Sequence, residues 1–195
     1  MNELVSRVNL TSMDKLRKFE KELNYINNAK IRDVASLFVS ELPEHFFYAP
    51  ASTTGRYHPK YASGEGGLLR HTQACVGIAV ELFNNHTIQN FAPWERDIIV
   101  LALILHDGRK HLNGQDKYNP YHPVDMAEYV RNRFIGDDFK MIRNLLADCI
   151  ETHMGEWCLN KDDSLILPTP KTEMQKFVHL CDYLASRRCL EFNFD

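Results

Sequence analysis

Apolar side chains recur at helical spacing in almost every periodic segment of the chain. Two N-terminal helices are predicted, the first from Leu16, Phe19, Leu23 and Ile26 after a start signal at Thr11 and Ser12, the second from Ile31, Val34, Phe38 and Leu42. Each carries one apolar stripe that needs a partner. We therefore expect them to pack as a pair on the rest of the chain.

Five further helices are predicted over residues 68–84, 93–107, 123–134, 138–154 and 172–189. Pro93 and Pro123 suit the first helical position, where no amide donor is lost. The helix over 93–107 is apolar on nearly all sides in the run IIVLALIL, which is typical of the buried central helix of a bundle. The predicted fold class is therefore an all-α helical bundle.

The segment over residues 49–67 is rich in Gly, Pro, Ser and Thr and has no helical period, so it is predicted to be a loop. Loops of this length in compact domains are often functional. Arg56 and His58 lie in it and are candidates for binding substrate phosphate, with a solvated loop as the alternative.

Length and composition fit one globular domain over residues 1–195, in which a helical pair over 1–45 packs on a core over 46–190. The chain is 44% hydrophobic and 25% charged, so it has no signature of disorder. A net charge of -3 gives no general attraction to a polyanion. Any phosphate contact must then depend on a local basic patch or on a metal.

The five cysteines are odd in number and contain no CxxC pair, which favours a reducing compartment. No apolar run approaches the roughly 20 residues of a membrane span, and the N-terminus lacks the long apolar run of a signal peptide. We therefore expect a cytoplasmic protein with no membrane partner.

Ionisable residues interrupt the apolar faces of several predicted helices. His106 and Asp107 end the buried central helix, while His71, His153 and Asp182 each fall on an apolar stripe. One buried His is often a hydrogen-bonded core residue. Several buried His and carboxylate groups without enough Lys or Arg partners would carry a large penalty unless a cation joined them.

The candidate ligands are imidazoles and carboxylates with no thiolate. Such a set suits a divalent cation of Mn, Fe, Co, Ni, Zn or Mg rather than a soft-metal site. A cation held in this way lowers the pKa of bound water and neutralises phosphate oxygens, as attack on phosphorus requires.

The order His71, His106-Asp107, Asp182 resembles the H...HD...D signature of the HD-domain superfamily of all-α metal-dependent phosphohydrolases. The motifs GGLLRHT, LILHDGRK and HLCDYLASR carry the resemblance. The YHP loop and the pairing of THMGEW with PTPKTEMQKFVHLCDYL look most like the HD domain of bacterial exoribonucleases that degrade RNA from the three-prime end.

The resemblance implies that His71, His106, Asp107 and Asp182 bind a first metal. It also implies that Asp107 bridges to a second metal held by His122 and His153, although a capping or loop role for His122 is an alternative. Dinuclear branches of the superfamily often have a His-His pair where this chain has His153-Met154, and HDGRK replaces the commoner HDIGK. Lys110 occupies the family's Lys position and is expected to contact phosphate.

The function expected from this resemblance is hydrolysis of phosphoester bonds by a metal-activated hydroxide, with Asp107 and Lys110 as catalytic residues. The chain has no room for a separate OB-type RNA-binding module and no aromatic-basic stripe for tracking single strands. A nucleotide or short oligonucleotide is therefore the expected substrate, and no long nucleic acid is expected. The alternatives are a noncatalytic HD module that binds a nucleotide and acts through a partner, and a nuclease acting on RNA three-prime ends.

Overall fold

The computed structural model describes residues 9–52, 58–111, 117–159, 164 and 166–190. Within these ranges the chain forms eight α-helices and four short 3₁₀ helices and has no strand, which confirms the all-α prediction. The α-helices are α1 (Ser12–Lys18), α2 (Glu20–Asn24), α3 (Ala29–Glu41), α4 (Gly67–Phe83), α5 (Pro93–Leu105), α6 (His122–Asn132), α7 (Lys140–Glu151) and α8 (Glu173–Ala185). The 3₁₀ helices are η1 (Glu44–Phe47), η2 (Lys60–Ala62), η3 (Asp137–Phe139) and η4 (Gly155–Trp157).

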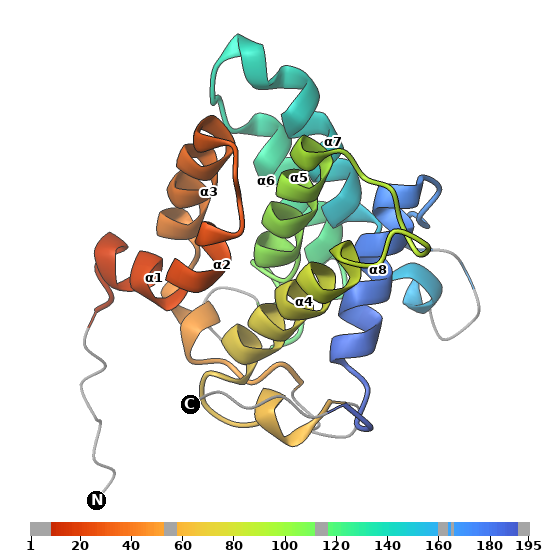
Figure 1. Cartoon of the computed structure of the whole chain (residues 1–195). Helices are drawn as coiled ribbons and strands as arrows, with labels where there is room; N and C mark the ends of the chain where they lie inside the picture. The colour runs from red at the N-terminus through yellow and green to blue at the C-terminus, as the bar shows by residue number, and fades with distance from the viewer. Residues whose placement is uncertain (1–8, 53–57, 112–116, 160–163, 165, 191–195) are drawn as a thin grey trace, which may run out of the picture.

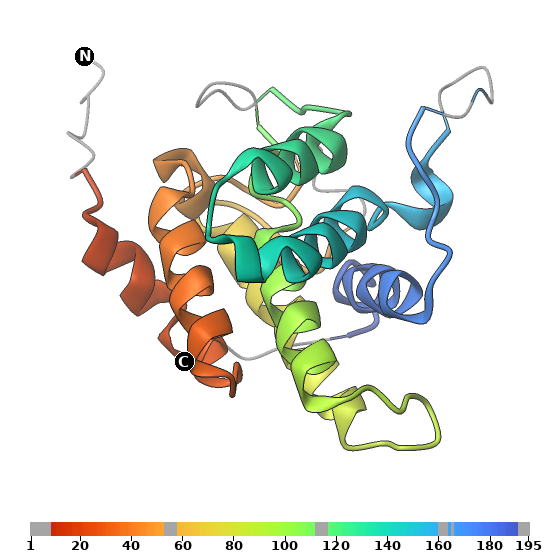
Figure 2. The ribbon, with the colours of Figure 1, turned by 90° about the horizontal axis from the view of Figure 1, so that it is seen from above.

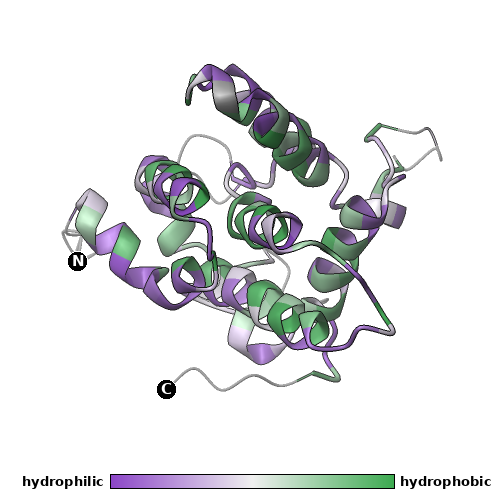
Figure 3. Ribbon diagram, turned by 45° about the horizontal axis from the view of Figure 1, so that its top comes forward, coloured by the Kyte–Doolittle hydropathy of each residue, from purple (hydrophilic) through white to green (hydrophobic). Residues whose placement is uncertain are grey.

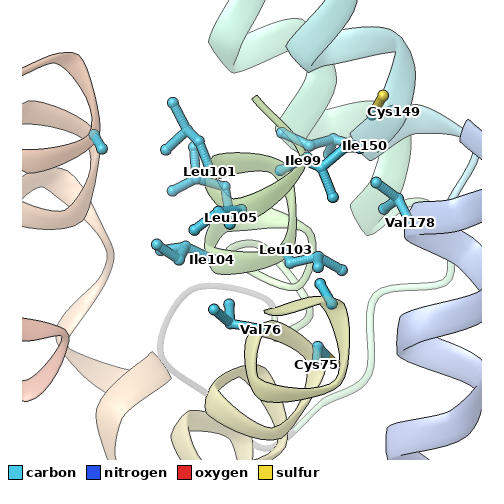
Figure 4. Packing of buried hydrophobic residues seen from close by; sticks show 14 of the residues in the cluster. Cys75, Val76, Ile99, Leu101, Leu103, Ile104, Leu105, Cys149, Ile150 and Val178 are labelled. Carbon is cyan, nitrogen blue, oxygen red and sulfur yellow. The ribbon is translucent and has the colours of Figure 1, made fainter. Parts of the chain in front are cut away.

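Helix α5 is the centre of the bundle, as its continuous apolar run predicts. The other helices surround it, with α1 to α3 on one side and α8 on the other (Figures 1 and 2). Residues 98–105 are all at most 1% exposed. In the close view of the core, the α5 side chains lie among Val76 of α4, Ile150 of α7 and Val178 of α8 (Figure 4). The end of this buried helix is thus surrounded by other helices.

The outer helices differ from α5 in how their polarity is distributed. Figure 3 shows hydrophilic and hydrophobic stripes on them, whereas residues 98–105 of α5 are all apolar. This pattern follows from packing, because an outer helix buries one face and leaves the other in water. The hydrophobic core runs without a break from Phe19, beside the N-terminal helices, to Ala185 at the end of α8.

The single helix predicted around Leu16, Phe19 and Leu23 is wrong, because the chain forms two short helices there. Phe19 separates α1 from α2 with a φ of -116° and a ψ of 15°, outside helical geometry. Its ring is fully buried, 6.1 Å from the ring centroids of both Phe46 and Phe47. The break turns this ring into the core, which hydrophobic spacing alone does not reveal.

Asp97 of α5 connects the N-terminal helices to the central helix. Its carboxylate is 2% exposed, and its two oxygens accept hydrogen bonds of 2.9 Å from the backbone amides of Asn27 and Asn28. The side chain of Asn28 also caps α3 by accepting from the amide of Ile31. These bonds hold the connection between α2 and α3 against the first turns of α5, at the far end from His106.

Candidate metal centre

The ligands predicted from the sequence come together at the end of α5. They are contributed by helices α4, α6 and α8 and by the turns that follow α5 and α7: His71, His106, Asp107, His122, His153 and Asp182. All six are buried, with exposed fractions from 0 to 8%. Residues separated by as much as 111 positions in the chain thus form one cluster.

One half of the cluster contains two imidazoles and two carboxylates. Nε2 of His71 lies 2.9 Å from Oδ1 of Asp182 and 3.8 Å from Oδ2 of Asp107. Nε2 of His106 lies 3.5 Å from the same Asp107 oxygen and 3.7 Å from the same Asp182 oxygen. Four donor atoms therefore face a common point between α4, α5 and α8.

The other half contains His122 and His153 and is joined to the first through Asp107. Oδ1 of Asp107 lies 3.0 Å from Nε2 of His122 and 3.7 Å from Nε2 of His153. The two Nε2 atoms are 3.2 Å apart. Asp107 thus directs one carboxylate oxygen to each half.

The protonation of three imidazoles follows from their hydrogen bonds to the backbone. Each places Nδ1 within 2.7 to 2.8 Å of the carbonyl oxygen three residues earlier, so Nδ1 carries the proton and donates: His106 to Leu103, His122 to Asn119, and His153 to Ile150. In the neutral rings, Nε2 is then a bare acceptor pointing into the cluster. Such backbone bonds orient metal-binding imidazoles in proteins.

The hydrogen-bond acceptors of this cluster face one another, and too few protons lie between them to form hydrogen bonds. Because Nδ1 of both rings donates to the backbone, His122 and His153 present their Nε2 atoms to each other and to the Asp107 carboxylate. Nε2 of His106 is buried and has no hydrogen-bond partner among the described residues. Buried acceptors left unpaired are costly, and a bound cation satisfies all of them at once. The donor set therefore fits a metal ion.

The charges around Asp107 keep it ionised. Burial alone would raise its pKa, but the charge of Lys110 outweighs burial and holds the pKa of this carboxyl well below its usual range. For Asp182, burial is likewise outweighed, chiefly by the hydrogen bond from His71, and its pKa is lowered. Both carboxylates are therefore ionised at neutral pH, as metal ligands must be.

Acid should destabilise the metal-free protein, because buried neutral histidines resist protonation. Burial lowers the pKa of His58 to about 3 and the pKa of His122 to about 4, and it also lowers the pKa of His71. At His106 the Asp107 carboxylate outweighs burial and raises the pKa. Between pH 6.5 and about 4, the unfolded chain binds more protons at the first three histidines, so stability falls as the pH falls. For His122 alone the loss is on the order of 3 kcal/mol.

Denaturant unfolding in EDTA at pH 7, 6, 5 and 4 measures this loss. His122→Asn, which has no imidazole to protonate, should show a smaller dependence on pH over the same range. A free energy of unfolding that stays constant from pH 7 to 4 would contradict the buried neutral state of these histidines.

A cysteine that the predicted ligand set omits also lies in the cluster. Sγ of Cys75 is 3.7 Å from Nε2 of His71, one turn further along α4. With His106 and Asp182 the two residues form a group of buried donor atoms within 4.8 Å of one another. Burial raises the pKa of the Cys75 thiol well above its usual value, so the group is a neutral thiol. The spacing of four residues from His71 could have indicated that Cys75 lies in the cluster, but a Cys on an apolar stripe normally behaves as a small hydrophobic residue.

A cavity of about 620 Å³ opens onto both halves of the cluster. Its lining includes Asp107, Asp182 and His153, together with Lys110 and His58. A second cavity of about 270 Å³ reaches Asp107 and Lys110 from the side of α3 and α6. The carboxylate between the two half-sites is therefore open to a small molecule.

The predicted substrate-binding residues are partly accounted for. Nζ of Lys110 donates to Oδ2 of Asp107 at 2.6 Å, and the lysine side chain is 13% exposed at the cavity. The ring of His58 lies 5.0 Å from that of His71, centroid to centroid, so His58 reaches the cluster. Arg56 lies outside the described residues.

Comparisons with protein-family models, with curated proteins and with solved structures gave no match. Among the described helices, none has the length and apolar character needed to cross a membrane.

Proposed function

We propose that the chain is a metal-dependent phosphohydrolase of the HD-domain type that cleaves phosphoester bonds of a nucleotide or short oligonucleotide. The observation that carries the proposal is the set of buried acceptors that face one another. His122, His153 and Asp107 place three of them within 3.7 Å, and the Nδ1 protons of both rings are used elsewhere. A structural core has no use for such an arrangement, because each unpaired acceptor costs stability.

Two groups of residues would hold the cations. One consists of His71, His106, Asp107 and Asp182, and the other of Asp107, His122 and His153. A divalent cation bound there supplies Lewis acidity toward water and toward phosphate oxygens. The Asp107 carboxylate serves both groups, so its charge and orientation decide whether either can form.

The other residues at the cavity have roles that follow from their charge. Lys110 is a cation beside Asp107 and is accessible from the cavity, so its ammonium can bind a nonbridging phosphate oxygen of the substrate. His58 stays neutral at physiological pH because burial lowers its pKa to about 3, and its ring can position a substrate oxygen without adding charge. A volume of about 620 Å³ falls within the range of roughly 300–1,000 Å³ typical of small-molecule sites.

Metal analysis of the purified protein, joined to a substrate screen, tests the proposal. Phosphomonoesters, nucleoside triphosphates, cyclic dinucleotides and short RNA would be incubated with Mn, Ni, Co or Mg, and product release followed by colorimetry and chromatography. We expect bound metal and metal-dependent release from a nucleotide or short oligonucleotide. Shortening of RNA from its three-prime end would favour the nuclease alternative. Release from none of them would contradict a phosphohydrolase and favour a noncatalytic nucleotide-binding module.

A further inference from the structure

Three side chains form an aromatic-cationic stack at the edge of the large cavity. The rings of Trp157 and Tyr183 are stacked, with centroids 5.5 Å apart and an interplanar angle of 13°. The guanidinium of Arg187 lies 4.2 Å from the Tyr183 ring centroid and 5.2 Å from that of Trp157. We call Trp157, Tyr183 and Arg187 the aromatic platform.

The platform is built onto the backbone that carries a candidate metal ligand. His179 of α8 donates from Nδ1 to the carbonyl oxygen of His153 at 2.8 Å, and its ring contacts Trp157 edge-on at 6.0 Å. Gly155, between His153 and Trp157, has a φ of +56°, and a Cβ there would lie 2.2 Å from Cε1 of His179. Only glycine permits both this backbone conformation and this close approach. The turn THMGEW therefore holds Trp157 in a fixed position relative to His153, which lies four residues earlier in the chain.

The platform faces the cavity with an exposed aromatic surface and a guanidinium group. Trp157 is 39% exposed, and both it and Arg187 line the cavity with Asp107 and Asp182. Arg187 donates to the hydroxyl of Ser186 at 2.8 Å, and no carboxylate pairs with it among the described residues. A large aromatic surface beside a cation and candidate metal ligands fits a ligand that combines a flat ring with a negative charge.

We propose that Trp157 stacks against the base of the bound nucleotide while Arg187 binds its phosphate or sugar oxygens. This deepens the proposed function, and rests on it for the position of the scissile phosphate at the metal ligands. Every base has a π-face, so stacking on an aromatic ring holds a base with little sequence preference. Arg187, already stacked on Tyr183, is pre-organised to bind an anion.

The first experiment follows the fluorescence of Trp157 alone. The chain has two tryptophans, and Trp94→Phe leaves Trp157 as the only one. Trp94 is at the other end of α5 from His106, roughly 18 Å along the helix. Adenosine 5′-monophosphate should quench the emission of this variant saturably, whereas ribose 5-phosphate, which lacks the base, should not. Titrations in EDTA prevent metal-dependent turnover during the measurement.

The second experiment measures affinity by calorimetry in EDTA for variants of the wild-type chain. Trp157→Ala should weaken binding of adenosine 5′-monophosphate by about tenfold or more, and Trp157→Phe should retain most of the affinity. Binding of ribose 5-phosphate should be unchanged in both variants. Circular dichroism of each variant establishes that the fold is intact, and the phenylalanine variant keeps the test valid if the alanine variant fails to fold.

These outcomes separate the platform from the proposed catalysis. Base-dependent quenching of Trp157, together with an affinity for adenosine 5′-monophosphate that falls when the indole is removed, supports the platform even if the chain hydrolyses nothing. Metal-dependent hydrolysis combined with equal affinity for adenosine 5′-monophosphate and ribose 5-phosphate would overturn the platform while leaving the phosphohydrolase intact. A Trp157→Phe variant that loses both ligands equally would also overturn it.

Discussion

Replacing Asp107 with alanine is expected to abolish bound metal and to lower turnover by a factor on the order of 1,000 or more, since changing even a residue that only orients a ligand costs roughly 10–100-fold. Asp107 faces His122 with one oxygen and His106 with the other, at 3.0 and 3.5 Å. It is therefore the one carboxylate among the predicted ligands that contributes to both half-sites. Without it, the half with His122 and His153 has no anionic donor, and the other half keeps only the carboxylate of Asp182 to offset the cation charge.

Metal content of Asp107→Ala after dialysis against Mn²⁺ and then buffer, measured by plasma mass spectrometry, gives the first readout. Turnover of the substrate found in the screen gives the second. Asp148→Ala is the matched control, because Asp148 is a carboxylate on α7 whose side chain pairs with Arg131 outside the cluster. Full turnover by Asp107→Ala without metal would eliminate the proposed mechanism.

The same substitution leaves Lys110 without its ion-pair partner. A buried charge stripped of its partner costs about 3–5 kcal/mol, less here because the lysine is partly exposed. The double variant Asp107→Ala/Lys110→Met removes both charges and should recover much of this stability. It should still bind no metal. The comparison separates loss of the site from loss of the fold.

The sequence predicts the bundle well because its signals are local. The apolar run of α5 identifies the central helix, and the ionisable groups on the apolar stripes of three other predicted helices indicate that these converge with its end. Burial of an unpaired His or Asp is expensive, so the physical argument and the resemblance to HD domains select the same residues. His71 and Asp182 could therefore be predicted to lie in one buried cluster without knowing how α4 and α8 pack.

Other features depend on long-range geometry and could not be predicted. The break at Phe19 depends on contacts with η1, which lies more than twenty residues away in the chain. The facing lone pairs of His122 and His153 depend on the carbonyls that receive their Nδ1 protons. The aromatic platform depends on η4 meeting α8, and Trp157 in a linear sequence has no pattern that links it to Tyr183.

Replacing Lys110 with methionine should separate metal binding from catalysis. Burial opposes the lysine's charge, but the carboxylates of Asp107 and Asp182 outweigh it and raise its pKa, so the group is a cation at neutral pH. Methionine keeps the length and packing of the side chain but removes that charge. Because a cation no longer competes for Asp107, metal content should be retained or increase. Turnover should fall by about 100-fold or more, as expected when one group that stabilises developing charge is lost.

The comparison of Lys110→Met with Lys110→Arg decides what the ammonium does. Arginine preserves the charge but not the compact ammonium beside Asp107, so it should recover part of the turnover if the cation binds phosphate. If Lys110 only neutralised the charge of Asp107, the result would differ. Lys110→Met would then keep normal turnover once metal is bound, because the bound cation would neutralise Asp107 instead. These cases are distinguished by measuring, for both variants, the metal content and the dependence of turnover on metal concentration. Wild-type turnover by the methionine variant would exclude Lys110 from the chemistry.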